Sequence, residues 1–362
     1  MVNPIQEVRQ LGQSIWLDYI RRDLITSGEL KKLVRDGISG LTSNPTIFQQ
    51  AIAQSSDYDE ALQALLKANP DSDVNTIYEH LAVEDIRMAA DILLPVYEAS
   101  DGVDGFVSLE VSPHLAYDTK TTTREAMRLW QLVARPNLMI KVPATAQGIP
   151  AIETLVAEGV NINVTLMFSQ NHYEAVSHAY IRGAARNPNP QQVASVASFF
   201  VSRVDTYVDR ELEKIGTEEA LALRGRAAIA NSKLVYRRFR EVFLGEEFAR
   251  ERRRGTRLQR VLWGSTSTKN PNYSDVMYVE GLIGPDTVNT LPLKTINTFR
   301  DHGKVYQTLD KGLEETEEVL AGLRRVGVNL ESITEQLQRD GVKAFVDSFD
   351  QLLTALAEKR KL

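Results

Sequence analysis

Short apolar segments alternate with amphipathic ones along most of the chain. Between the apolar segments lie stretches with helical periodicity, several with a capping polar residue at the start and glycine at the end. This alternation predicts a parallel sheet covered by helices. Eight segments are rich in β-branched and other apolar residues and end in polar ones, as strands do: 13–20, 37–45, 105–113, 138–145, 160–169, 193–200, 257–267 and 286–293.

Eight such units fit an α/β fold, a closed (β/α)8 barrel of the TIM type, which usually takes about 250 residues. A doubly wound open sheet is the competing fold, but no G-x-G-x-x-G motif follows any of these strands. The extra length falls in helical insertions at about 57–100 and 202–256 and in C-terminal helices at about 307–361. No low-complexity linker divides the chain, so we expect a single domain over residues 1–362.

Composition and charge narrow the classes of protein. The 362 residues are 43% hydrophobic and carry a net charge of −6, so no overall basic charge attracts nucleic acid. The chain has no cysteine, which excludes disulfides and thiol nucleophiles. The N-terminus has no apolar export signal, and no window approaches the roughly 18 apolar residues of a membrane span, so we expect a cytoplasmic protein.

Two further features are best explained without a ligand. The basic run "RERRRGTR" (250–257) has acidic neighbours and no interleaved aromatic residue, which favours a solvated helix end over a nucleic-acid patch. His172 and His178 lie in a predicted helix without a third ligand at a suitable spacing, so we expect no metal site.

Polar residues stand at the ends of the predicted strands. In a barrel of parallel strands the C-terminal ends share one face, and that face carries the chemistry. Taken alone, Asn44 before a proline suits a turn, and Glu110 suits a loop carboxylate. The combined set comes from seven strands and predicts one polar site: Asp18, Asn44, Glu110, Lys141, Asn163, Thr165, Ser198 and the segment 265–269.

Lys141 lies in the stretch "NLMIKVPATAQG" (137–148), directly after three apolar residues. A charged lysine inside a buried strand is costly, so Lys141 must be paired, neutral, or at a strand end that faces a cavity rather than the barrel interior. The plain alternative is a structural ion pair with a carboxylate on a neighbouring strand. A lysine amine withdrawn from water can instead attack a carbonyl and form a Schiff base.

Schiff-base chemistry also requires proton transfer. The protonated imine withdraws electrons during carbon–carbon cleavage, while a base removes a hydroxyl proton and an acid helps to expel water. Two separately placed carboxylates can supply these steps without a metal. Asp18 and Glu110 are the candidates.

Five stretches of the chain resemble the transaldolases, which are class I Schiff-base aldolases, and together they span nearly its whole length. The last of them resembles one bacterial branch with an STSTKNP motif after the seventh strand. The stretches are "GLTSNPTIF" (40–48), "SLEVSP" (108–113), "IKVPATAQGIPAIETLVAEGVNINVTLMFS" (140–169), "SFFVSRVDTY" (198–207) and "WGSTSTKNPNYSDVMYVEGLIGPDTVNTLP" (263–292).

The resemblance implies a role for each site residue. Lys141 would form the imine, Asp18 would take the proton of the C4 hydroxyl, and Glu110 would act through a water molecule. Phe200 would line the pocket, and Arg203 would bind the substrate phosphate together with Lys269 and the hydroxyls of Ser265 and Ser267. The short polar side chains would orient this water and the substrate hydroxyls: Asn44, Asn163, Thr165 and Ser198.

The implied reaction moves a dihydroxyacetone unit from sedoheptulose 7-phosphate to glyceraldehyde 3-phosphate, in the non-oxidative pentose phosphate pathway. It needs no cofactor and no metal. The expected partners are small-molecule sugar phosphates and, as a candidate assembly, a second copy in a homodimer; neither nucleic acid nor a membrane is expected. Since the chain ends at Leu362, we expect a free-standing enzyme rather than a fusion with an isomerase.

Two rival functions remain open at this point. One is a simple Schiff-base aldolase of the same family that releases free dihydroxyacetone. The other is a binding protein without catalysis, in which the barrel serves as a scaffold and the helical insertion and tail serve as docking surfaces. The second rival predicts that Lys141 forms no imine.

Overall fold

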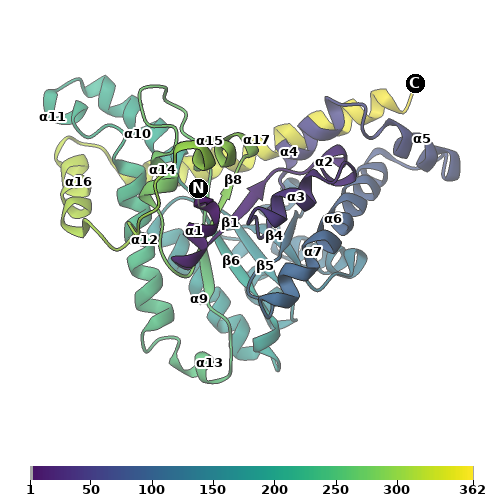
Figure 1. Ribbon diagram of the computed structural model, residues 1–362, viewed down its shortest axis with the longest axis horizontal. Coiled ribbons are helices and arrows are strands. Elements are labelled where there is room, and N and C mark those ends of the chain that lie inside the picture. The colour runs from purple at the N-terminus through teal and green to yellow at the C-terminus, as the bar shows by residue number, and fades with distance from the viewer. Residues whose placement is uncertain (1–2, 362) are drawn as a thin grey trace.

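Eight parallel strands close into a barrel, and each pairs with the strands before and after it in the chain (Figure 1). The structure is a computed structural model that describes residues 3–361. It confirms the (β/α)8 barrel predicted from the sequence. The strands are β1 (Gln13–Asp18), β2 (Leu41–Thr42), β3 (Val107–Glu110), β4 (Leu138–Pro143), β5 (Ile162–Met167), β6 (Ser195–Phe200), β7 (Gln259–Gly264) and β8 (Thr287–Leu291).

The second strand is much shorter than its apolar pattern predicts. Of the segment 37–45, only Leu41 and Thr42 form a ladder with the neighbouring strands. Asn44 caps a short helix instead, and its side chain accepts a hydrogen bond from the Ile47 N–H at 3.0 Å. Proline directly after the cap suits the first turn of a helix and ends the strand.

Helices surround the barrel, and the three segments predicted as insertions and tail are helical (Figure 1). In the first half they are α1 (Pro4–Gln10), α2 (Arg22–Thr26), α3 (Glu29–Arg35), α4 (Pro45–Phe48), α5 (Asp59–Ala68), α6 (Val74–Ala99), α7 (Thr119–Val133), α8 (Gly148–Ala157) and α9 (Gln170–Arg186). In the second half they are α10 (Ser202–Ile215), α11 (Glu218–Leu221), α12 (Ala227–Leu244), α13 (Ala249–Arg253), α14 (Met277–Gly281), α15 (Leu293–His302), α16 (Leu313–Arg325) and α17 (Leu330–Lys359).

Apolar side chains fill the barrel interior below the C-terminal ends of the strands. The Trp16 indole is fully buried there, and its N–H donates to Asp104 Oδ1 at 2.6 Å. Gly40 leaves room for this ring, because a Cβ at that position would lie 2.5 Å from the indole. We call this cluster the barrel plug: Trp16, Phe106, Met139, Ala194, Val196, Leu262 and Val288.

The last helix, α17, crosses the barrel and packs against α4, α6, α10 and β5 (Figure 1). The Gln338 side-chain amide donates to the carbonyls of Ala144 and Leu166 at 3.0 Å each, just after β4 and within β5. Gly341 permits this close approach, since a Cβ there would lie 2.8 Å from the Leu166 side chain. The C-terminal helix is thus part of the wall around the strand ends.

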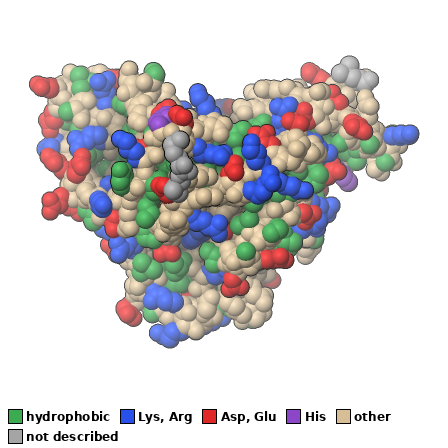
Figure 2. Space-filling view, viewed as in Figure 1, with side chains coloured by type: hydrophobic (Ala, Val, Ile, Leu, Met, Phe, Trp, Pro, Cys, Tyr) green, Lys and Arg blue, Asp and Glu red, His purple; other side chains and the backbone are tan. Residues whose placement is uncertain are grey.

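The surface mixes charges of both signs, as the face in Figure 2 shows. In the basic segment 250–257, the Arg254 side chain pairs with Glu251 at 2.6 Å and donates to the Asn187 carbonyl at 2.6 Å. Arg252 donates to the Phe243 carbonyl at 2.6 Å. Among the described residues, no helix is both long enough and apolar enough to cross a membrane.

Candidate active site

A cavity of about 340 Å³ lies above the barrel plug, at the C-terminal ends of the strands. Lys141, Asp18 and Ser198 each follow a plug residue by two positions, so the alternation of side chains along a strand turns them to the same interior. We call this space the barrel cavity. Nine of the predicted residues line it: Asp18, Asn44, Lys141, Ser198, Phe200, Arg203, Ser265, Ser267 and Lys269.

Lys141 is buried inside β4, with two strand residues after it. The expectation that a strand-end position would turn Lys141 away from the barrel interior is therefore wrong. The plug fills only the lower part of the barrel, so the interior itself opens into a cavity at the level of Lys141. Its Nζ donates to the Ser43 carbonyl at 3.2 Å and lies 5.7 Å from the centre of the Phe345 ring.

Glu110 stands opposite Lys141 in the register of β3 and β4. Its Oε2 lies 3.0 Å from Lys141 Nζ, and both side chains are only 5% exposed. Burial raises the pKa of the Glu110 carboxyl, although Lys141 partly offsets this effect. Both groups have therefore lost most of their hydration, and the raised pKa suits Glu110 to accept a proton from its neighbour. Glu110 is near enough to take a proton from the Lys141 amine, so no more distant base is needed to make that amine neutral.

Asp18 ends β1 and faces the same cavity. The Thr42 hydroxyl donates to Asp18 Oδ1 at 2.8 Å. Burial raises the pKa of the Asp18 carboxyl, while Lys141, Thr42 and Arg203 act in the opposite direction. A carboxylate with a raised pKa in a cavity is suited to accept a proton from a bound hydroxyl near neutral pH.

Two further cationic side chains, Arg203 and Lys269, border the barrel cavity. The Arg203 guanidinium, at the start of α10, lies 5.3 Å from the centre of the Phe200 ring. The Lys269 ammonium donates to the Ser267 hydroxyl at 2.7 Å. Burial and the nearby Arg203 lower the pKa of Lys269, which indicates that the two cations share one region. Two cations held together beside hydroxyls are suited to bind a phosphate.

Comparison with known proteins decides the family. A family model described as Transaldolase/Fructose-6-phosphate aldolase matches residues 15–356. A protein of Thiobacillus denitrificans named transaldolase is 49% identical over 360 residues, which cover 98% of this chain and 100% of the relative. Transaldolases of Trichodesmium erythraeum and Frankia alni are 43% and 45% identical, with 100% and 99% of this chain and 98% of each relative aligned. The chain belongs to the transaldolase/fructose-6-phosphate aldolase family.

Membership of this family confirms the prediction of an enzyme, a transferase with transaldolase function that acts on sugar phosphates. It also argues against the second rival function, a binding protein without catalysis, because the family is enzymatic. The roles of individual residues and the bacterial branch within the family stay predictions.

Asn163 and Thr165 lie deeper than expected for transaldolase residues that touch substrate. Both are fully buried and stand outside the described lining of the barrel cavity. Asn163 is held in a chain of hydrogen bonds, because it donates to the Ser108 hydroxyl at 3.0 Å and accepts from the Ser198 hydroxyl at 2.7 Å. The Thr165 hydroxyl is buried without a hydrogen-bond partner among the described residues.

Asn44 combines the turn role and the site role that its sequence position left open. Its Oδ1 caps α4, as described above, and the same residue borders the barrel cavity. The cap fixes the orientation of the amide, so its Nδ2 group is the part that can meet a ligand. The helix start thereby places one polar group at the cavity wall.

Ten of the residues that line the barrel cavity were not predicted from the sequence, among them Tyr19, Gln50 and Phe345. Tyr19 directly follows Asp18, so its position one residue beyond the strand end was a usable signal. Gln50 belongs to a single π-helical turn after α4, Gln49–Ala53, and Phe345 to the C-terminal helix α17. Neither lies near a predicted strand end, and only the three-dimensional fold brings them to the site.

The two histidines set aside earlier make ordinary polar contacts. His172 Nε2 lies 2.8 Å from Glu335 Oε1, and His178 Nε2 lies 2.6 Å from Glu247 Oε1. Within residues 3–361 no group of three or more His, Asp or Glu side chains is arranged to hold a metal ion. Both histidines connect α9 to neighbouring segments.

Proposed function

We propose that Lys141 is the residue of this enzyme that forms a Schiff base with the ketose phosphate. The observation that carries the proposal is the position of its amine, between a buried carboxylate at 3.0 Å and a cavity lined by cations and one further carboxylate. Proton transfer from Lys141 to Glu110 leaves a neutral amine, the form that attacks a carbonyl. A salt bridge with no cavity beside it would not support this role.

The two carboxylates then divide the proton transfers. Glu110 adjoins the imine nitrogen, which supports its role in protonating the leaving hydroxyl during imine formation and in activating water during hydrolysis. Asp18 is held by Thr42 within the cavity, where it can take the C4 hydroxyl proton as the carbon–carbon bond breaks. Four short polar side chains are proposed to orient the water that Glu110 uses and the hydroxyls of the three-carbon unit: Asn44, Asn163, Thr165 and Ser198.

The phosphate of the substrate is proposed to bind Arg203 and Lys269, with the hydroxyls of Ser265 and Ser267. Arg203 is the stronger anchor, because a guanidinium offers a planar pair of donors, whereas the Lys269 ammonium is a single point of charge. The Phe200 ring beneath Arg203 limits its movement. Phosphate at this end of the barrel cavity orients the sugar chain toward Lys141.

Transfer, rather than simple cleavage, requires that the enamine on Lys141 survive until an aldehyde arrives. Phe200 and Phe345 border the cavity near this point and reduce the access of water. We therefore favour transfer of the dihydroxyacetone unit from sedoheptulose 7-phosphate to glyceraldehyde 3-phosphate, with erythrose 4-phosphate and fructose 6-phosphate as products. A simple aldolase would release free dihydroxyacetone instead.

Product analysis with and without an acceptor separates these two outcomes. With sedoheptulose 7-phosphate alone, we expect less than one equivalent of erythrose 4-phosphate per enzyme and no accumulating dihydroxyacetone. Addition of glyceraldehyde 3-phosphate should give continuous turnover and fructose 6-phosphate. Steady release of dihydroxyacetone without acceptor would overturn the transfer proposal in favour of the aldolase.

Three predictions about the whole protein belong with this proposal: a single folding domain, a cytoplasmic location and a homodimeric assembly. Cooperative loss of structure in one thermal transition would support the single domain. Light scattering of the purified protein measures the assembly directly, and a molar mass near that of one 40.5 kDa chain would contradict the homodimer.

A further inference from the structure

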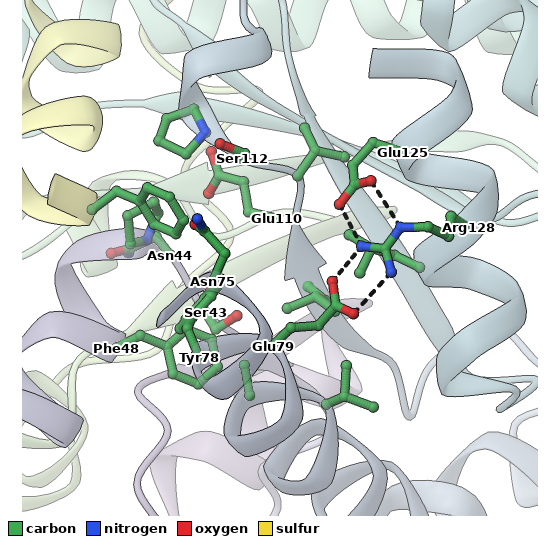
Figure 3. A pocket seen from close by; sticks show the side chains of 18 of the residues that line it. Ser43, Asn44, Phe48, Asn75, Tyr78, Glu79, Glu110, Ser112, Glu125 and Arg128 are labelled. Atoms are coloured by element: carbon green, nitrogen blue, oxygen red, sulfur yellow. Dashed lines mark hydrogen bonds and ion pairs between the residues drawn. The ribbon is translucent and has the colours of Figure 1, made fainter. Parts of the chain in front are cut away.

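A second cavity, of about 400 Å³, borders Glu110 (Figure 3). We call it the side cavity. Its walls come from the end of β3 and from α4, α6, α7 and α17. Figure 3 shows the Glu110 carboxylate, the Ser112 hydroxyl and the Asn75 amide gathered in one part of it, with Arg128 between Glu79 and Glu125 in another.

The Lys141–Glu110 pair lies between the two cavities, and Asn44 lines both of them. Lys141 lines the barrel cavity and is absent from the lining of the side cavity, whereas Glu110 lines only the side cavity of the two. Glu110 is buried, and its Oε2 accepts no hydrogen bond of good geometry from the described residues. The carboxylate that adjoins the imine nitrogen thus opens toward a space that the substrate chain does not occupy.

The two cavities have opposite charge. The barrel cavity is lined by three cations and one carboxylate, Asp18. The side cavity is lined by four carboxylates and one cation, and that cation, Arg128, is already bound on both sides: it donates to Glu79 at 2.8 Å and to Glu125 at 2.9 Å. A sugar phosphate is therefore drawn to the barrel cavity and repelled from the side cavity, while water enters either.

We propose that the side cavity is the path by which water leaves and reaches Glu110 during imine formation and hydrolysis, separate from the opening that admits the sugar phosphate. This inference rests on the proposed Schiff-base role of Lys141. The space is large enough for several water molecules, and its hydroxyl, amide and carboxylate groups can bind them.

The chemistry places the released water on the side of Glu110. Addition of the amine to the keto group gives a carbinolamine, in which the new N–C bond is made and the keto oxygen has become a hydroxyl. The Glu110 carboxyl gives its proton to this hydroxyl, the C–O bond breaks, and protonated imine, carboxylate and one water result. Hydrolysis runs the same steps in reverse with one water taken up.

Separate paths for water and sugar would let the imine exchange water with solvent while the enamine on Lys141 survives long enough to meet the acceptor aldehyde. Each turnover expels one water and later takes one up, yet the enamine carbon in the barrel cavity must not be protonated by bulk solvent. The side cavity gives the expelled and returning water a route to Glu110 that bypasses the enamine carbon, while the acceptor aldehyde reaches that carbon through a cavity bordered by Phe200 and Phe345. The catalytic pair forms part of the wall between the two routes.

Isotopic labelling tests the path without relying on the overall rate. The donor ketose carries ¹⁸O at its keto group. At short reaction times, mass spectrometry measures how much ¹⁸O remains in the keto group of the product ketose, fructose 6-phosphate. If the expelled water leaves freely, the product carries solvent oxygen. If it is trapped beside Glu110, the same oxygen returns, and the product keeps the donor label.

Asn75→Trp should block the side cavity at its exposed rim and raise the fraction of retained donor oxygen by at least about threefold over wild type. Thr76→Trp, at the same rim, is a second blocking variant in case the first does not fold. Glu98→Trp, on the exposed part of α6 outside the cavity, should leave retention at the wild-type value. Lys141→Met measures the uncatalysed exchange.

Equal retention in wild type and in a folded blocking variant would overturn the water path and leave the Schiff-base role intact. Failure of the proposed function has a different signature: the wild-type enzyme then gives no imine on Lys141 and no transfer, and the water path fails with it. Increased retention in Glu98→Trp as well as in the rim variants would also contradict the proposal, because it would show an effect unrelated to the cavity.

Discussion

Two buried ion pairs of this protein look alike in distance and differ in their surroundings. Arg22 Nε lies 2.6 Å from Asp85 Oδ1, and the Tyr58 hydroxyl donates to the other oxygen of Asp85 at 2.6 Å. Asp85 is fully buried and both of its oxygens are bonded. In the Lys141–Glu110 pair, the Glu110 oxygen nearest Lys141 lacks a hydrogen bond of good geometry, and each partner faces a cavity.

The difference teaches how to distinguish a structural pair from a catalytic one. The first pair joins α2 to α6 through groups whose bonding capacity is used up within the protein, so it has nothing left for a ligand. The second pair keeps a nucleophile and an acid partly unsatisfied beside space for reactants. The alternatives posed by the sequence, ion pair or nucleophile, are not exclusive, because Lys141 has an ion-pair partner and an open cavity together.

The largest expected effect is on activity when the nucleophile is removed. Lys141→Met should lower kcat/KM for transfer by at least about 1,000-fold, because no other amine can replace the one that forms the imine. The matched control is Lys233→Met, which removes a half-buried lysine whose Nζ donates to the Lys311 carbonyl elsewhere in the protein. A transfer rate above one tenth of wild type in Lys141→Met would contradict the comparison, because the Lys141–Glu110 pair would then be as dispensable for catalysis as the Arg22–Asp85 pair.

Replacement of the acid should be somewhat less severe. Glu110→Gln keeps the shape of the side chain and removes its proton-transfer capacity, so we expect transfer to slow by about 100- to 1,000-fold. The slow step should be imine formation. Its rate is measured by a rapid chemical quench with borohydride, which traps the imine at timed intervals. A variant that forms the imine at the wild-type rate but fails in carbon–carbon cleavage would show that Glu110 has the role assigned here to Asp18.

The structural pair should respond in stability instead. Asp85→Ala leaves the mostly buried Arg22 with only the exposed Glu84 as partner and the Tyr58 hydroxyl without its acceptor, and we expect the free energy of unfolding to fall by about 3–5 kcal/mol, with activity per folded molecule retained. Glu84→Ala is the matched control: Glu84 pairs with the same arginine at 2.8 Å but is 56% exposed, so its loss should cost less than about 1 kcal/mol. Denaturant unfolding with an activity assay on the folded fraction checks both.

Stability should also depend on pH through Asp85. Burial raises the pKa of its carboxyl to about 6 in the folded protein, from an ordinary value of 3.8. Its contribution to stability is therefore complete below about pH 3.8 and is lost as pH rises through about 6. Asp85→Asn should remove this decline when the free energy of unfolding is measured from pH 4 to pH 8. An identical pH dependence in variant and wild type would be inconsistent with the raised pKa.

The smallest effect concerns the phosphate region. Lys269→Met should raise KM for sugar phosphates by about tenfold, since one cationic contact is lost. Asp18 must be ionised to act as a base, so activity falls as pH falls through its raised pKa. Lys269 is among the cations that lower this pKa, so the variant should move the acid limb of the kcat profile to higher pH. Lys269→Arg should leave the limb in place.

Several parts of the site could be predicted because they depend on sequence spacing alone. Asp18, Lys141 and Ser198 are polar residues at the ends of predicted apolar strands, so they could be grouped without coordinates, and all three line the barrel cavity. The number of strands followed in the same way from the alternation of patterns. Both the strand-end residues and the number of strands depend only on the order of apolar and polar residues within short segments, so the sequence alone predicts them.

Other features depend on contacts between distant segments. The docking of α17 brings Phe345 to Lys141, although 204 positions separate them in the numbering of the chain. The side cavity beside Glu110 is formed by helices from several segments, and no strand pattern predicts its volume or its charge. The short β2 was also missed, because the apolar run around Leu41 reports burial and not hydrogen bonding between strands.

Reductive trapping on the intact enzyme is the most direct test of the central claim, that Lys141 is a nucleophile although it is ion-paired. The enzyme is incubated with fructose 6-phosphate, reduced with borohydride and digested, and the peptides are analysed by mass spectrometry. We predict a three-carbon adduct on the peptide that contains Lys141, reduced in amount in Glu110→Gln and absent in Lys141→Met. An unmodified Lys141 peptide under conditions of active transfer, or an adduct on another lysine, would contradict the account.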